Sequence, residues 1–335
     1  MCPTSRATGS GWWPVCSSSP RRRVAARLLG VVLLVLGIAA GVEPVKAREG
    51  GIHGAMPAKN GHVFVPTAFI PDAFVDTELS ISLGYSNSIA TEIPLFTSGG
   101  QQIGTVEGDL LFMNGSVEFN CALRDWIGFF ARFKALARSG GNTASIFASG
   151  LSAGSGFGMG WEFRLRESDR SMLSASVALD RTTVTLIDVA AFIDDPSRRL
   201  ARDFTPLVGT AQVRYAYGFS DLIGLSAFGG VGLGENPAKS YDNTWFWQLG
   251  GVASVNLAKR HGVPLGFALG ARTSSYPLTY DKADGNTWAG LATVAYMGRS
   301  DFSIALDTIY EYVPVEYEDV ALGYIGFNVG LTYTF

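Results

Sequence analysis

The sequence predicts an all-β fold, a transmembrane antiparallel β-barrel of about twelve strands over residues 76–335. Three observations support this prediction. Apolar and polar side chains alternate at every second residue in many short segments, as they do on the two faces of a strand. Very short and longer links between these segments take turns along the chain. The chain is also 16% charged, whereas an ordinary soluble domain is about 25% charged.

The alternating pattern recurs in twelve segments of 8 to 14 residues. In order along the chain they are residues 77–86, 115–123, 126–138, 157–166, 173–180, 210–219, 222–234, 245–258, 263–275, 287–297, 302–313 and 322–335. Their period is two, whereas a helix would repeat its apolar positions at a period of about 3.6 residues. An even number of strands also places both ends of the chain on the same side of a closed barrel.

The links between the segments predict the orientation of the barrel. The short links read "ALRD", "ESDR", "FSD", "AKRHG" and "GRS". The longer links are residues 88–105, 139–153, 185–206, 235–243, 276–285 and 314–320. Transmembrane barrels have short turns on the periplasmic side and longer loops outside the cell. Both termini are on the side of the short turns, so we expect the termini to be periplasmic and the long loops to be extracellular.

Aromatic side chains gather near both predicted membrane boundaries. They are Tyr85, Trp245, Trp247, Trp288, Tyr310 and Tyr312 on the loop side, and Trp126, Tyr215, Tyr217, Phe219, Phe302, Tyr333 and Phe335 on the turn side. Two such belts are typical of membrane barrels. The competing interpretation is a soluble β-sandwich, in which the aromatic residues would form a core and exposed strand ends would carry charges. The belts favour the barrel.

The last strand ends the chain on an aromatic residue. Val329, Leu331, Tyr333 and Phe335 form one row of the final segment, and small or polar residues form the other row. In an extended strand the two rows lie on opposite faces. We expect the apolar row to face lipid. We also expect this terminal strand to close the barrel, because a strand in lipid must be paired on both edges.

This terminal stretch resembles the C-terminal β-signal of bacterial outer-membrane β-barrel proteins. The residues that carry the resemblance are Asn328, Gly330, Tyr333 and the terminal Phe335. In that family the barrel-assembly machinery recognises the motif during insertion. The resemblance therefore implies a location in the cell outer membrane, with the outer-membrane lipid and the assembly machinery as partners. It identifies a class of membrane protein and says nothing about a substrate.

Residues 1–47 are predicted to be a leader that contains a secretory signal peptide. Arg21–Arg23 supply a basic start, residues 28–42 are apolar, and Ala47 is a small residue suited to cleavage. The alternative is a membrane helix, but the apolar run is shorter than the roughly 20 residues that a helix needs to span a bilayer. Residues 1–20 lie upstream of the basic region and fit no part of a signal, so we interpret them as a mis-assigned start.

Residues 48–75 precede the first predicted strand and carry two alternative interpretations. Their apolar tract is interrupted by Pro66 and Pro71, so it suits neither a helix nor a strand. The segment either folds into the lumen as a plug or lies along the periplasmic rim. The sequence leaves both open.

Charged residues on the other row of the strands are predicted to line the lumen, because a charge at the lipid face costs about 2–4 kcal/mol at the bilayer midplane. The candidate solute-binding residues are Glu118, Arg132, Lys134, Glu162, Arg164, Arg166, Arg214, Arg272, Asp307 and Glu311. Cations dominate on some strands and carboxylates on others that become neighbours on closure. Such segregation would set a field across the lumen and orient small anionic or zwitterionic solutes.

These residues predict a channel or transporter for small solutes. One alternative is a closed barrel, in which opposed Arg and Glu side chains pair into a network and the extracellular loops act as an adhesin or structural anchor. A barrel-embedded hydrolase is the third class. It is disfavoured because His53, His62 and His261 are all predicted to lie far from the outer rim, where such enzymes need a base.

Composition and motifs predict no further ligands. The formal net charge of −3 provides no field for nucleic acid. The stretch "YDKADGN" at residues 280–286 lacks the oxygen ligand and the closing Glu of a calcium loop, and turn chemistry explains its Asp and Gly residues. We therefore expect no metal, no cofactor and no nucleic-acid partner.

Overall fold

The computed structural model describes residues 55–88, 91–96, 102–108, 111–139, 150–187, 195, 197, 199, 201–236, 242–275, 286–314 and 321–335. The chain divides into two compact units, residues 1–43 and 44–335, and all described residues belong to the second. The predicted leader, residues 1–47, lies outside the described residues.

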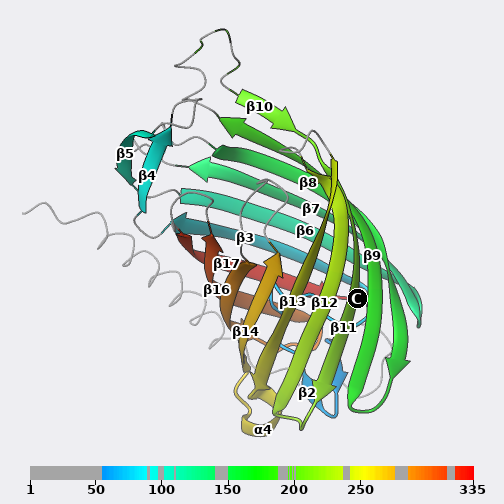
Figure 1. Cartoon of the computed structure of the whole chain (residues 1–335). Helices are drawn as coiled ribbons and strands as arrows, with labels where there is room; N and C mark the ends of the chain where they lie inside the picture. The colour runs from blue at the N-terminus through cyan, green and yellow to red at the C-terminus, as the bar shows by residue number, and fades with distance from the viewer. Residues whose placement is uncertain are drawn as a thin grey trace, which may run out of the picture. The chain divides into compact units, whose positions relative to one another are not determined.

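Twelve antiparallel strands close into a barrel (Figure 1). They are β3 (Glu78–Ser88), β6 (Leu111–Arg124), β7 (Ile127–Ser139), β8 (Gly150–Glu167), β9 (Ser171–Ile187), β11 (Leu207–Gly218), β12 (Ile223–Asn236), β13 (Asp242–Asn256), β14 (Leu265–Ser275), β15 (Asn286–Tyr296), β16 (Phe302–Pro314) and β17 (Ala321–Thr334). Each pairs with the next along the chain, and β17 pairs with β3 to complete the ring. The predicted fold class and strand number are confirmed.

The closing seam is fully paired. Leu331 lies opposite Ile81 and Tyr333 opposite Leu79, and the Phe335 amide donates a hydrogen bond of 2.9 Å to the Thr77 carbonyl. On its other edge β17 pairs with β16 along its whole length. A strand in hydrocarbon finds no water for its backbone groups, so pairing on both edges satisfies the backbone groups of β17.

The barrel wall has an apolar outer face. Leu83, Leu269 and Trp245 are 67–70% exposed on the outside. On β17, Leu331 and Phe335 are exposed while Asn328 and Thr334, on the opposite face, are buried. The apolar row of the terminal strand therefore points outward. Large apolar side chains that are 36–70% exposed along the wall are stable in lipid and costly in water.

Five short turns lie at one end of the barrel, here called the turn end. They are residues 125–126, 168–170, 219–222, 257–264 and 297–301, and the fourth contains the helix α4 (Ala258–His261). In the described part of the chain no helix is long and apolar enough to span a membrane. At the opposite end the strands extend further than their apolar pattern predicts.

Two predicted links contain additional strands. The first link, expected at residues 88–105, extends to residue 110 and holds the hairpin β4 (Thr91–Phe96) and β5 (Gln102–Gly108). Within the link expected at 185–206, β10 (Ala201–Phe204) pairs with the upper part of β9. Both lie beyond the apolar segments, where nothing in the sequence alternates strongly enough to predict a strand.

Residues 55–77, here called the inner segment, lie inside the barrel. The segment begins with the two-residue strands β1 (Ala58–Lys59) and β2 (His62–Val63), which form a hairpin around Asn60 and Gly61. Its described side chains contact inward-facing residues of many barrel strands.

Candidate functional site: the barrel lumen

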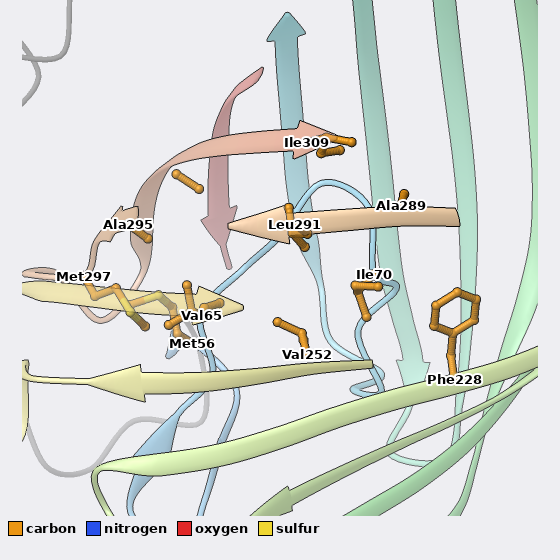
Figure 2. Close-up of a cluster of buried hydrophobic side chains, with 12 residues drawn as sticks. Met56, Val65, Ile70, Phe228, Val252, Ala289, Leu291, Ala295, Met297 and Ile309 are labelled. Atoms are coloured by element: carbon orange, nitrogen blue, oxygen red, sulfur yellow. The ribbon is translucent and has the colours of Figure 1, made fainter. Parts of the chain in front are cut away.

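The inner segment packs against one half of the inner wall. A cluster of apolar inward-facing residues on β12–β16 buries Met56, Val65 and Ile70 (Figure 2). The wall residues in this cluster are Phe228, Val252, Ala268, Ala289, Leu291, Ala295, Ala305 and Ile309, joined by Met297 at the turn end. Burying a side chain such as Val65 or Ile70 contributes about 1.5–3 kcal/mol. This half of the wall therefore holds the segment by ordinary hydrophobic packing.

Hydrogen bonds fix the beginning of the inner segment at the turn end. The Met56 amide donates to the Ser300 carbonyl at 2.5 Å, and the Asn60 amide donates to the Asp169 carbonyl at 2.7 Å. The Lys59 ammonium forms an ion pair with Glu167. These contacts involve turns on different sides of the barrel, so they fix the hairpin across the turn end.

His62 is a structural residue of the same hairpin. Its imidazole is completely buried, with Nε2 2.8 Å from the Ser254 hydroxyl oxygen and its ring edge-on to Phe64. Burial lowers the pKa of His62, so the ring is neutral at pH 7. A Cβ added at Gly224 would collide with this ring. Glycine is required there because the hairpin approaches the wall so closely.

The inner segment reaches furthest into the barrel at Ala68 and Phe69. The Ala68 amide donates to Asp307 Oδ2 at 3.2 Å, and the Thr293 hydroxyl donates to Asp307 Oδ1 at 2.5 Å. The Phe69 ring lies 5.4 Å from the Arg272 guanidinium carbon, within cation–π range. Asp307 is completely buried by these contacts. It anchors the segment and is not open to the lumen.

The segment then returns to the turn end along a polar part of the wall. Arg214 donates to the Asp72 carbonyl at 3.1 Å and forms an ion pair with Glu162. The Thr77 hydroxyl accepts a hydrogen bond of 3.1 Å from the Ala122 amide just before β3 begins. Arg214 and Glu162 are both buried, so this pair supports the return of the segment.

The carboxyl group of Asp72 lies on the lumen side of this return. It is open to the lumen and accepts a hydrogen bond of 2.5 Å from the Phe74 amide. Desolvation inside the barrel, together with the like charges of Asp76 and Glu162, raises the pKa of Asp72 to about 7. The lumen therefore holds a carboxyl group that changes its charge near neutral pH.

Three arginines of the lumen form ion pairs along the wall. Arg132 Nε donates to Asp180 Oδ1 at 2.8 Å and Nη2 to Oδ2 at 2.5 Å, across the intervening Gly158 of β8. Arg272 and Glu311 pair at 3.2 Å across Ala289 of β15. Arg214 and Glu162 are likewise two strands apart. Small residues on the middle strand make these bridges possible, and at Gly158 a Cβ would lie 2.9 Å from Arg132 Nε.

These pairs correct the expected charge pattern. The sequence suggested cations on some strands facing carboxylates on others across the lumen. Instead, Arg132, Arg214 and Arg272 are each neutralised by a carboxylate two strands away, because inward-facing side chains reach over one small neighbour. The pairs follow the wall and do not cross the bore.

The remaining predicted residues lie at different levels. Lys134 is exposed to the lumen, and Glu118 is half-buried directly opposite Arg132 in the β6–β7 register. Arg164 forms an ion pair of 2.7 Å with Glu167 near the turn end. Lys134 is therefore more accessible from the lumen than Arg132, Arg164, Arg214 and Arg272, which are all paired.

Arg166 does not lie on the lumen side. A β-bulge between Arg164 and Arg166 shifts the register, so that Arg166 pairs with Leu173, a member of the outward row of β9. The bulge adds one residue, and one residue reverses every side chain that follows. Glu167 consequently points inward, where it meets Lys59.

Neutral polar side chains line the part of the wall that the sequence analysis left out. On β3, β6 and β17 the inward-facing residues include Ser80, Ser82, Ser86, Asn114, Ser116 and Thr332. The Ser82 and Ser116 hydroxyls are 2.7 Å apart, and those of Ser80 and Thr332 are 3.2 Å apart. The alternation of serine with apolar residues in "ELSISLGYS" could have predicted this polar row, but the sequence prediction considered only charged residues.

Within the described ranges, no group of three or more His, Cys, Asp or Glu side chains is arranged to hold a metal ion.

Comparisons with known proteins give distant structural likenesses. No family model and no curated protein matches the sequence. An outer-membrane channel from Pseudomonas putida F1 aligns with a TM-score of 0.46 and 12% identity over 81% of this chain and 100% of that one. A FadL homologue from Pseudomonas aeruginosa aligns at 0.45 and 10% over 84% and 100%. The NanC porin aligns at 0.44 and 7% over 77% and 100%.

Proposed function

We propose that this protein is an outer-membrane channel for small polar solutes. The observation that carries the proposal is the contrast between the two faces of one closed wall. The outer face exposes large apolar side chains, whereas much of the inner face carries hydroxyl, amide and charged groups. A wall with this polarity matches lipid outside and water inside.

The proposal includes an orientation of the barrel in the outer membrane and a route of assembly. The turn end faces the periplasm, and the loops face the outside of the cell. Residues 1–47 act as the leader that is removed after secretion. Asn328, Gly330, Tyr333 and Phe335 act as the signal for the barrel-assembly machinery.

The charged residues of the lumen select among solutes. Lys134 attracts anionic groups, and the neighbouring Glu118 carboxylate favours zwitterions over simple anions. The ion pairs of Arg132, Arg214 and Arg272 hold side chains against the wall and keep them out of the bore.

A second function is favoured by the inner segment, which occupies the apolar half of the lumen. In that case the barrel is closed, and its extracellular loops act as a structural anchor or adhesin. The two functions differ in whether solute crosses the wall.

Liposome swelling separates them. Liposomes that contain the purified protein should swell in small polar solutes, with a rate that falls as solute size increases. Lys134→Glu should slow the entry of anions and leave neutral solutes unchanged. Arg260→Glu makes the same charge change in the exposed turn helix α4 and should alter neither rate. Liposomes that do not swell although the barrel is folded would support the closed alternative.

A further inference from the structure

The inner wall is divided into two chemically different halves. On β12–β16 a cluster of apolar inward residues, interspersed with buried polar ones such as Ser254, Thr293 and Ser303, packs against the inner segment, and Val252, Ala268 and Ile309 are each no more than 5% exposed. On β17, β3 and β6 the inward residues are mainly serine, threonine and asparagine, and most of them remain partly exposed to the lumen. These strands are contiguous in the ring, so the division runs along the barrel.

The first part of the inner segment is matched to the apolar cluster of β12–β16, and its return packs Ala73 and Phe74 against Met172 and Ala216 of β9 and β11. Val65 packs over Gly266 of β14, where a Cβ atom would lie 2.6 Å from Val65 Cγ2. Ile70 belongs to the cluster with Leu291 and Phe228 (Figure 2). Moving the segment across the lumen would expose these side chains to water and place them opposite hydroxyl groups. Each apolar side chain so exposed would cost about 1.5–3 kcal/mol. The buried Asp307 would also lose the hydrogen bond that it accepts from the Ala68 amide.

We propose that solutes cross the barrel along the polar half of the wall, formed by β17, β3 and β6, while the inner segment stays fixed on β12–β16. This inference rests on the proposed channel function and adds the route. The inner segment acts as a permanent filler that narrows the lumen and leaves one hydrogen-bonding face open. Solutes rich in hydroxyl or amine groups can exchange their water for this face, and apolar solutes find no continuous apolar path.

A pair of amide groups marks the middle of the route. Gly84 lies between Asn328 and Asn114 in one row across β17, β3 and β6. A Cβ at Gly84 would lie 2.5 Å from Asn328 Oδ1 and 2.6 Å from Asn114 Oδ1, so both oxygens converge over the glycine. Among the described residues Asn114 Oδ1 has no hydrogen-bond partner.

Thiol labelling during single-channel recording tests the route. In a Cys121→Ala background, Ser82→Cys and Ser116→Cys place thiols on the polar half, and Ala268→Cys places a matched thiol on the covered half. A sulfonate-bearing methanethiosulfonate reagent should lower the current about twofold or more at Ser82→Cys and Ser116→Cys, because it adds bulk and charge to the route. It should leave Ala268→Cys unchanged. The reverse pattern would overturn the route.

A disulfide tests whether the inner segment stays in place. The Val65 side chain comes within 2.6 Å of a Cβ built at Gly266, which brings the two Cβ atoms close to disulfide distance. Val65→Cys with Gly266→Cys should therefore lock the segment to β14, and reduction with dithiothreitol provides the matched control in the same molecules. We expect equal conductance in the oxidised and reduced states. A current that appears only after reduction would show that the segment must leave, and would refute the inference.

Failure of the route and failure of the channel function give different results. A folded wild-type barrel that carries no current removes the channel function, and the route with it. A conducting wild type whose current is insensitive to labelling at Ser82→Cys and Ser116→Cys keeps the channel function and removes only the route.

Discussion

The Arg132–Asp180 pair provides a quantitative test of the ion pairs along the wall. Two hydrogen bonds join the guanidinium and the carboxylate, and the side chains are 20% and 22% exposed. Breaking a fully buried pair by removing one partner costs about 3–5 kcal/mol, and partial access of water reduces that cost. We therefore expect Arg132→Ala and Asp180→Ala each to lower the free energy of unfolding by about 2 kcal/mol.

The double variant separates the pair from its surroundings. If the cost of each single variant comes mainly from the partner left without a counter-ion, the double variant should cost about the same as one single variant. The coupling free energy is then about 2 kcal/mol. The measurement is urea unfolding in phospholipid vesicles, followed by tryptophan fluorescence. Circular dichroism before unfolding checks that all variants form the barrel.

The exposed Arg299–Asp301 pair in the turn at residues 297–301 is the control. It has similar geometry, with an Arg299 Nη2 to Asp301 Oδ2 distance of 2.7 Å, but its arginine is about half exposed. We expect no measurable coupling there because water and salt screen the pair. Additive single effects at Arg132 and Asp180, equal to those of the control pair, would refute the reasoning.

Three further predictions follow from the same contacts. Reversal potentials of the wild type should show cation selectivity rising as pH increases through about 7, since Asp72 is neutral below that pH and anionic above it; Asp72→Asn should abolish this rise, and a wild type with pH-independent selectivity would contradict the assignment. The same carboxyl group contributes stability in acid that is lost as pH rises through about 7, because in the unfolded chain it ionises near 3.8. Ile70→Asp should loosen the inner segment by about 3 kcal/mol or more and increase protease cleavage within residues 55–77, whereas Ala68→Gly should leave cleavage unchanged; equal protection in both variants would show that the apolar cluster does not hold the segment. Deletion of Phe335 should reduce the heat-modifiable form in the outer-membrane fraction, and normal assembly would argue against the terminal signal.

The barrel itself was accessible from the sequence because its strands must alternate. A wall between lipid and water imposes a period of two on each strand, as in the final stretch that ends at Phe335. Closure, strand number and the side of each turn follow from that period and from link length. The extra strands β4, β5 and β10 lie beyond the two-faced wall and leave no comparable pattern.

The arrangement inside the lumen was less predictable for physical reasons. The bulge beside Leu165 reverses the facing of Arg166, and a bulge has no signature in a pattern read by counting alternate positions. The partners of Arg132 and Arg272 lie two strands away, and the reach of these side chains depends on a glycine or alanine between them. Asp307 was predicted to be open to the lumen. Its partner, the Ala68 amide, lies on the inner segment, which has no alternation of apolar and polar residues from which its position could be predicted.

The most direct test of the account is the current through single wild-type molecules in a planar bilayer. We expect steady ohmic current with the inner segment intact. We expect the ion selectivity to be small, because the arginines of the lumen are paired. It should shift toward cations above about pH 7, where Asp72 ionises. Silence from a barrel whose folding is demonstrated by heat-modifiable migration would contradict the account. The function would then lie in the extracellular loops.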